Sequence, residues 1–166
     1  MVSSVRARRV ARAEWERVRE LRLRALADAP DAFGSTLDEE RALGEAEWVG
    51  WIEGWEGSTN ALFIAEDGER WVGMAVGSRA GDEPDAHVYG MWVEPSRRSS
   101  GLGASLVEQV LRWARTWDAR SVILGVTETN AGAAAFYEHL GFADTGERDP
   151  LREGSELRVR IFRREL

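Results

Sequence analysis

The stretch from His87 to Val107, reading HVYGMWVEPSRRSSGLGASLV, constrains the fold of this chain more than any other segment. It begins as an alternating, β-prone run that is interrupted at Pro95. A short basic, serine-rich segment follows, and an apolar-periodic helix is predicted from Gly101 onward. Backbone N–H groups at the start of a helix lack intrahelical partners, and the helix dipole is positive there. The order strand, glycine turn and helix therefore predicts a place that can hold phosphate.

Composition narrows the class of protein. A length of 166 residues with 43% apolar and 31% charged residues is typical of one globular domain, here 1–166. No apolar run predicts a membrane-spanning helix or a signal peptide, so we expect a cytoplasmic protein. The net charge of −7 disfavours a nucleic-acid partner. Cys is absent, and the two His, His87 and His139, are far apart, so we expect no metal site.

Hydrophobic periodicity predicts a mixed order of strands and helices. Three strands between residues 61 and 94 read as an antiparallel meander, and the apolar run from Ser121 to Thr127 reads as a buried strand of a βαβ unit. The fold class is α/β, a mixed sheet with helices packed on it. The predicted strands are 5–10, 61–66, 71–78, 87–94, 121–127, 142–147 and 157–163. The predicted helices are 13–27, 102–117 and 130–140, and a further helix, the second in the chain, starts at Ser35 or Thr36 and carries Trp55.

The glycine turn can be explained in two ways. Glycine lets a backbone approach an anion closely, Arg98 can add a charge-assisted bond, and Ser99 can donate from its hydroxyl group. The same turn can also be a β–α connection that uses Gly101 and Gly103 for geometry alone. It is not a Walker A loop, because the Gly-Lys-Ser/Thr ending is absent, and a third glycine for a Rossmann fingerprint is missing.

Two motifs together resemble the signatures of the GNAT acyltransferase superfamily. The first is Val93-x-Pro95-x-x-Arg98-x-x-Gly101-Leu102-Gly103, which is similar to the acetyl-CoA pyrophosphate loop. The second, at the expected separation, is Asn130-Ala131-x-Ala133-Ala134-x-Phe136-Tyr137-x-x-Leu140-Gly141-Phe142. The resemblance implies a mostly antiparallel sheet with helices on both faces, splayed between its fourth and fifth strands. Gly90 is expected to mark the β-bulge that opens this sheet.

The resemblance also implies the donor, acetyl-CoA, and the residues that bind it. Backbone groups of the fourth strand would bond the pantetheine and the acetyl carbonyl like an added strand. The start of the following helix would hold the pyrophosphate, and Asn130 would bond the pantetheine arm. The cofactor-binding residues implied are Met91, Trp92, Val93, Arg98, Ser99, Gly101, Leu102, Gly103, Ala104, Ser105, Asn130 and Tyr137.

Two residues are the candidates for catalysis. Tyr137 matches the tyrosine of the family that donates a proton to the departing thiolate, although an ordinary helix Tyr packed beside Phe136 explains it as well. His87 matches the position where some relatives carry a base, and a His suits proton removal near neutral pH. The alternative for His87 is a local hydrogen bond at a strand end. We expect His139 at the surface.

The acceptor is expected to contact the segment from Phe33 to Trp55 and the hairpin from Asp149 to Ser155. Phe33, Glu40 and Tyr89 are the candidate acceptor-binding residues, and an aromatic and acidic pocket for an amine would also include Glu39, Trp48, Trp51 and Trp55. The favoured alternative is that the tryptophans form the core-facing stripe of a helix, with the acids as first-turn dipole partners.

The function implied is acetyl-CoA-dependent N-acetylation of a small-molecule amine or a peptide, with no nucleic-acid or membrane partner. Transfer of another acyl group and a non-catalytic acyl-CoA-binding regulatory module are the alternatives. A homodimer is an expectation from the family. No motif in the chain identifies the acceptor.

Overall fold

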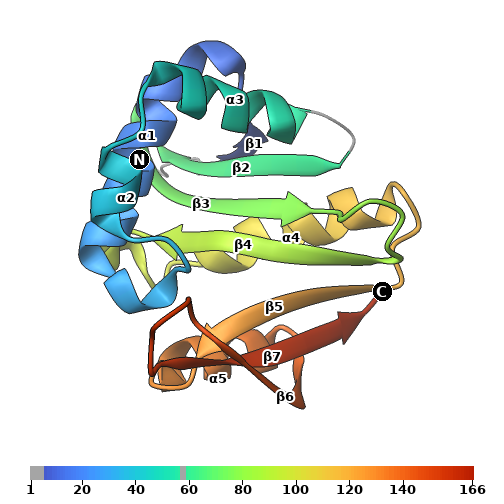
Figure 1. The fold of residues 1–166 in the computed structure, drawn as a ribbon. Coiled ribbons are helices and arrows are strands. Elements are labelled where there is room, and N and C mark those ends of the chain that lie inside the picture. The colour runs from blue at the N-terminus through green and yellow to red at the C-terminus, as the bar shows by residue number, and fades with distance from the viewer. Residues whose placement is uncertain (1–5, 57–58) are drawn as a thin grey trace.

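The computed structural model describes residues 6–56 and 59–166, apart from the side chains of Arg6, Trp55 and Glu56. The strands lie in one sheet in the order β1-β2-β3-β4-β5-β7-β6 (Figure 1). Every neighbouring pair is antiparallel except β4 and β5, which are parallel, and this confirms the predicted mixed sheet. The strands are β1 (Arg6–Arg9), β2 (Asn60–Asp67), β3 (Arg70–Ser78), β4 (Asp85–Val93), β5 (Ser121–Thr127), β6 (Ala143–Pro150) and β7 (Arg158–Glu165).

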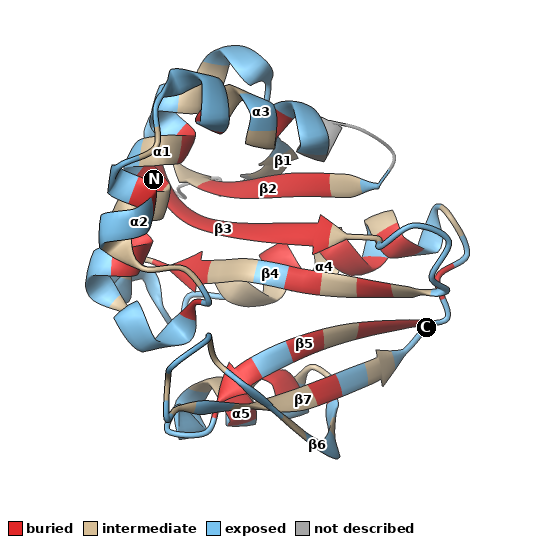
Figure 2. Ribbon diagram, viewed as in Figure 1, coloured by how far each residue is buried: buried red, intermediate tan, exposed pale blue. Residues whose placement is uncertain are grey.

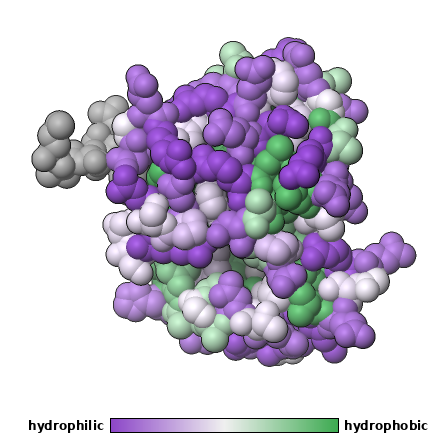
Figure 3. Space-filling view, turned by 90° about the vertical axis from the view of Figure 1, so that its left-hand side faces the viewer, coloured by the Kyte–Doolittle hydropathy of each residue, from purple (hydrophilic) through white to green (hydrophobic). Residues whose placement is uncertain are grey.

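Helices cover both faces of the sheet, as predicted (Figure 1). On one face lie α1 (Trp15–Asp28), the short α2 (Leu37–Arg41) and α3 (Glu45–Glu56), and on the other lie α4 (Leu102–Arg115) and α5 (Ala131–His139). Each face has its own apolar core, and buried residues run along the central strands (Figure 2). The outer surface on the side of α1 and α2 is mostly hydrophilic, with hydrophobic residues in smaller areas (Figure 3). Val5, predicted to open the first strand, lies outside the described residues.

The prediction of a single second helix is wrong, because the segment forms two helices, α2 and α3. Thr36 and Glu39 make the predicted capping box at α2: Glu39 N–H donates to Thr36 Oγ1 (3.3 Å), and Thr36 N–H donates to Glu39 Oε2 (2.8 Å). Gly44 N–H donates to Glu47 Oε2 (3.0 Å), so a second acidic side chain reaches back to the start of α3. Gly44 thus divides the predicted helix into two.

Helix α3 packs Trp48 and Ile52 into the core. Trp48 is 0% exposed and Ile52 is 1% exposed, whereas Trp51 is half-buried. The core interpretation of Trp48 is therefore confirmed. The side chain of Trp55 lies outside the described residues.

Helix α4 packs closely on β3. Leu102, Leu106 and Val110 are buried and confirm the predicted apolar stripe. Gly77 of β3 makes the close approach possible, because a Cβ at this position would lie 2.7 Å from Trp113 Cε3. Protein interiors are packed too densely to absorb such an overlap without displacement of a side chain or the backbone.

Strand β4 parts from β5 after a short pairing. Residues 85–87 of β4 pair with residues 121–123 of β5, and the pairing ends there. Opposite β3, Gly90 and Met91 face the single residue Ala75, and Gly90 has a φ of +58°. This arrangement is a β-bulge at a glycine, as predicted. Beyond it the two strands diverge (Figure 1), which confirms the predicted splay.

The contact between α4 and β3 can be tested with two matched glycine substitutions. Gly77→Ala is expected to lower the free energy of unfolding by about 1–3 kcal/mol through overpacking against Trp113. Gly50→Ala makes the same chemical change on α3, where no atom lies within 4 Å of the added Cβ. It is expected to raise the free energy of unfolding by about 0.5–1 kcal/mol. Urea denaturation measures both, and equal stabilities would contradict the packing described.

Candidate active site

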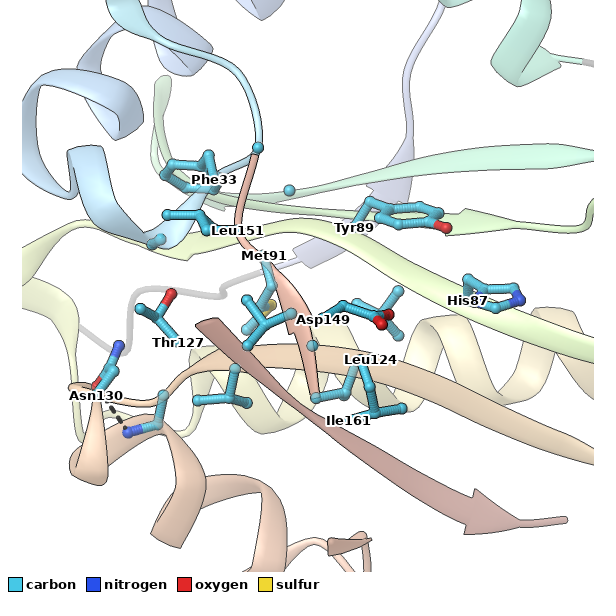
Figure 4. Close-up of a pocket in the computed structure, with 18 of the residues that line it drawn as sticks. Phe33, His87, Tyr89, Met91, Leu124, Thr127, Asn130, Asp149, Leu151 and Ile161 are labelled. Atoms are coloured by element: carbon cyan, nitrogen blue, oxygen red, sulfur yellow. Dashed lines mark hydrogen bonds between the residues drawn. The ribbon is translucent and has the colours of Figure 1, made fainter. Parts of the chain in front are cut away.

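A cavity of about 700 Å³ opens where β4 and β5 part (Figure 4). Figure 4 shows Asn130 at one end of this cavity and His87 at the other, with Met91 and Asp149 between them. The cavity lies between two strands of the sheet, and its lining includes Arg22 of α1 on one face and Tyr137 of α5 on the other. Its walls are formed by residues 32–35 between α1 and α2, 87–91 of β4, 123–127 of β5, Asn130, Ala133 and Tyr137 at α5, and 149–151 near the turn between β6 and β7.

Helix α4 begins beside this cavity without a side-chain cap. Its N-cap residue is Gly101 with a φ of +88°, and Ser99 has a φ of +61°. Ser105 N–H donates to Gly101 O (3.0 Å) and closes the first turn. The N–H groups of that first turn have no intrahelical partners, and the helix dipole adds positive potential. The start of α4 is therefore suited to an anion such as a diphosphate.

Arg98 is held against the end of β4. Its Nε donates to Val93 O (2.9 Å), and its Nη2 donates to Asp28 Oδ2 (2.6 Å). Trp92 Nε1 donates to the same carboxylate oxygen (2.9 Å), and the Trp92 side chain is buried. Arg98 thus fixes the glycine turn to α1 and β4, and its Nη1 remains as a donor for an anion. The Trp92 side chain is therefore held in the core on the α1 face and does not line the cavity.

Gly103 joins the start of α4 to the cavity. A Cβ at Gly103 would lie 3.0 Å from Phe136 Cζ and 3.3 Å from Met91 Cε. Met91 in turn lines the cavity. The start of α4 and the cavity are therefore separated by no more than one side chain, and a Cβ at position 103 would require Phe136 or Met91 to move by a few tenths of an ångström.

Asn130 caps α5 and faces the cavity. Its Oδ1 accepts a hydrogen bond from Ala133 N–H (3.0 Å), which fixes the side chain. Because the oxygen is used in the cap, the amide nitrogen Nδ2 is left to donate to a ligand.

Tyr137 is buried on α5, between Phe136 (ring centroids 5.0 Å apart) and Phe142 (5.8 Å). Burial raises the pKa of the phenol well above its usual range, because the phenolate loses its hydration there. Within residues 6–56 and 59–166, the Tyr137 hydroxyl has no hydrogen-bond partner. A neutral hydroxyl lines the cavity and is available as a proton donor.

His87 and Tyr89 project from the same side of β4. Their rings are stacked, with centroids 5.9 Å apart and planes 8° apart. His87 Nε2 lies 3.5 Å from Glu83 Oε2, and both rings line the cavity. His87 is thus a half-buried imidazole with a carboxylate beside it, which suits proton transfer with the exterior.

On the side of α1, Arg22 is a cavity residue that the sequence reasoning missed. Its guanidinium makes a paired contact with Glu40, with Nε to Oε2 at 2.9 Å and Nη2 to Oε1 at 2.8 Å. Its Cζ lies 4.5 Å above the Phe33 ring. Glu40 is 2% exposed and lies behind Arg22, outside the cavity lining. The sequence does carry one signal for Arg22: it is a charged residue within the apolar stripe of α1, one turn after Val18.

The connection between α1 and α2 is hydrogen-bonded to segments on the other side of the opening between β4 and β5. Arg152, which follows β6, donates to the carbonyl oxygens of Phe33 (2.9 Å) and Pro30 (3.2 Å). Thr127, at the end of β5, donates to Asp31 O (2.5 Å). The connection between α1 and α2 therefore lies over the cavity as a fixed wall.

Six predicted site residues line the cavity: Phe33, His87, Tyr89, Met91, Asn130 and Tyr137. The residues predicted to hold the pyrophosphate lie next to it, at the start of α4. Val93 lies at the end of β4, beyond the lining. His139 is exposed, as expected. Within the described ranges no group of three metal-binding side chains occurs, and no helix is long and apolar enough to span a membrane.

These features define an α/β protein with an open sheet, a cavity at the opening and an anion-binding helix start beside it. A model of the Acetyltransferase (GNAT) family matches residues 15–142. The chain therefore belongs to the GNAT acetyltransferase family.

The chain is similar to mycothiol acetyltransferases. It is 30% identical over 127 residues to the protein of Thermobispora bispora, which covers 74% of this chain and 40% of that protein. It is 36% identical over 117 residues to the protein of Saccharomonospora viridis, which covers 66% of this chain and 36% of that protein. The chain thus spans well under half the length of these relatives.

Two solved structures have the same fold. The yncA protein of Salmonella typhimurium, solved with its cofactor acetyl-CoA, has a TM-score of 0.80 at 19% identity and covers 99% of this chain and 95% of its own. The paia N-acetyltransferase of Thermoplasma acidophilum, in complex with coenzyme A, has a TM-score of 0.78 at 14% identity and covers 98% and 99%.

The burial of Tyr137 predicts a pH dependence of stability. The chain has two Tyr and neither Lys nor Cys, so the tyrosines dominate titration between about pH 9 and 12. Because burial raises the pKa of Tyr137 in the folded state, the folded protein keeps a proton that the unfolded chain loses above about pH 10. The free energy of unfolding is expected to fall above that pH by up to about 1.4 kcal/mol per pH unit. Tyr137→Phe is expected to flatten this decline in denaturation series, whereas Tyr89→Phe keeps most of it.

Proposed function

We propose that this protein transfers the acetyl group of acetyl-CoA to a primary amine, with both substrates bound at once. The observation that carries the proposal is the opening between β4 and β5 next to the uncapped start of α4. One surface offers an unpaired strand edge, and the other offers backbone donors for a diphosphate. The names of the mycothiol acetyltransferases and the coenzyme A bound in the structural neighbour from Thermoplasma acidophilum support this proposal.

The residues around the opening fit the donor. Acetyl-CoA supplies a thioester carbonyl that accepts a nucleophile and a thiolate that leaves. Backbone groups of Met91, Trp92 and Val93 bond its pantetheine arm and acetyl oxygen, and Asn130 Nδ2 donates to the same arm. The pyrophosphate lies against the N–H groups of residues 101–104, with Arg98 and Ser99 as side-chain donors. Ser105 contributes its hydroxyl, because its N–H already donates to Gly101 O.

The chemistry needs a base, an oxyanion donor and an acid. His87 removes a proton from the acceptor nitrogen, directly or through water, and Glu83 stabilises the imidazolium. A backbone N–H at the bulge, near Met91, stabilises the carbonyl oxygen as negative charge develops on it. A C–N bond forms, the C–S bond breaks, and Tyr137 donates its proton to the sulfur. The products are the N-acetylated amine and the free thiol of coenzyme A.

The acceptor is a small-molecule amine or a peptide. The protein acts in the cytoplasm as one domain, residues 1–166, and as a monomer or a homodimer. It binds neither nucleic acid nor a membrane. Transfer of another acyl group and a regulatory acyl-CoA-binding role are the competing functions. Release of free thiol from acetyl-CoA in the presence of an amine panel separates catalysis from binding alone. Replacement of acetyl-CoA by propionyl-CoA or succinyl-CoA in the same assay tests the acyl group.

The donor site can be tested with two matched substitutions. Gly101 and Gly68 both have positive φ (+88° and +62°), and nothing lies within 4 Å of a Cβ at either position. Glu at either position is expected to cost a similar strain of about 1–3 kcal/mol. Only Gly101→Glu places a carboxylate against the pyrophosphate, so only this variant is expected to lose the thermal stabilisation by acetyl-CoA. Retained stabilisation in Gly101→Glu would remove α4 from the donor site.

The acid and the base can be tested by substitution. Tyr137→Phe and His87→Gln are each expected to lower kcat by about 10²-fold or more, with thermal stabilisation by acetyl-CoA unchanged. Unchanged turnover in either variant withdraws the role of that residue.

A further inference from the structure

We infer that Arg22 is a specificity residue of the acceptor site and binds a carbonyl oxygen attached to the carbon that bears the acceptor amine. The acceptor class is therefore an α-amino amide or a peptide N-terminus rather than a simple alkylamine. This inference rests on the proposed acetyl transfer and names its acceptor chemistry.

The guanidinium of Arg22 is fixed before any ligand arrives. Its side chain is 12% exposed, and Nε and Nη2 are both bonded to Glu40, whose side chain is 2% exposed. The Phe33 ring packs against the planar face of the guanidinium. Three contacts thus fix the rotamer and the plane of a long side chain, so little rotamer entropy is lost when the arginine binds a ligand.

One nitrogen of Arg22 is left to donate. Nη1 has no hydrogen-bond partner in the described part of the chain and is not among the buried, unpartnered atoms, so the cavity gives it access to solvent or ligand. It lies 3.3 Å from the position that a Cβ would take at Gly90. Gly90 is the bulge residue, next to the backbone that would hold the thioester. A group bonded to Nη1 would therefore lie beside the backbone proposed to hold the thioester, close to the attacking nitrogen.

Charge favours a neutral oxygen at this position. Glu40 already balances the charge of Arg22, so the pair adds no net positive potential. Besides this arginine, His87 and the two tyrosines, the ionisable groups that line the cavity are Glu147 and Asp149, and neither acid makes an ion pair among the described residues. A free carboxylate on the acceptor would face these two acids, whereas an amide carbonyl accepts from Nη1 without that repulsion.

Arg22 also lies between the main cavity and a smaller side cavity into which the acceptor could extend. A side cavity of about 170 Å³ shares Arg22, Tyr89 and Gly90 with the main one and extends over β3 to Met74 and Trp51. An acceptor that enters this side cavity passes Nη1. The arginine is therefore placed to contact the group next to the amine of an acceptor that extends into this side cavity.

The test compares leucinamide, leucine and isoamylamine, which is leucine without its carboxyl group. Rates are expressed per unprotonated amine, so that differences in amine basicity cancel. Wild-type protein is expected to acetylate leucinamide with the highest kcat/KM, followed by leucine and then isoamylamine. The double variant Arg22→Met with Glu40→Met removes the buried pair without an unpaired charge. It is expected to lose about 10- to 100-fold in kcat/KM for leucinamide, mostly through KM, and to change isoamylamine by less than about 3-fold.

Two further variants separate recognition from folding. Arg22→Lys keeps a donor but not the fixed fork, and is expected to restore part of the preference for leucinamide. Glu40→Gln keeps Arg22 but weakens the ion pair that holds its guanidinium in place. This variant is expected to raise KM for leucinamide more than for isoamylamine. An equal loss on all three amines, or a wild type that does not prefer leucinamide to isoamylamine, overturns the inference.

The outcomes distinguish this inference from the proposed function. Thermal stabilisation by acetyl-CoA and thiol release with isoamylamine report acetyl transfer without any role for Arg22. A protein that passes both measurements but acetylates neither leucine nor leucinamide keeps its proposed function and loses the inference. A preference for leucine over leucinamide overturns the inference that Arg22 binds an uncharged carbonyl oxygen, and indicates that it binds a carboxylate instead.

Discussion

The early end of the pairing between β4 and β5 is the constraint on which the rest of this structure depends. Two neighbouring strands of one sheet stop sharing hydrogen bonds after three residue pairs. Backbone groups that are buried without a partner cost about 1–3 kcal/mol each, so the exposed edge must face water or a ligand. The bulge at Gly90 turns β4 away from β5 and keeps this edge open. A cavity in the middle of the sheet follows directly.

An open sheet needs support on both sides of the gap. The apolar core on the α4 and α5 face gives part of it, since this core contains buried residues of β2–β4 and also of β5 and β7. The core on the α1 and α3 face packs against β2–β4. Across the gap, Thr127 and Arg152 bind the connection between α1 and α2. The wall formed by this connection is thus fixed by hydrogen bonds to its main-chain carbonyl oxygens.

Much of this arrangement follows from the sequence because local patterns determine it. The stripe Leu102, Leu106 and Val110 fixes the buried face of α4, and a lone glycine in a strand indicates the bulge at Gly90. The two motifs around Gly101 and Tyr137 locate the donor side, since glycine turns and helix caps involve residues close in the sequence. The sequence did not predict that the second helix divides at Gly44, because one glycine within a helical pattern is often tolerated.

The acceptor side was less accessible from the sequence, because its contacts join distant segments. Arg22 and Glu40 are separated by 18 residues and Arg152 and Phe33 by 119, and no periodicity links such pairs. Glu40 was expected at the ligand, but it lies behind Arg22, because burial of its carboxylate requires a cationic partner. Only the position of a charge within an apolar stripe marks Arg22 in advance.

The bonds that hold the connection between α1 and α2 have a consequence for how such a site diverges. Arg152 and Thr127 bind main-chain carbonyl oxygens at Pro30, Asp31 and Phe33, which every residue type possesses. Side chains in this segment can therefore change during evolution while its anchoring bonds persist. A lineage can alter which acceptor it recognises without rebuilding the frame that holds the donor.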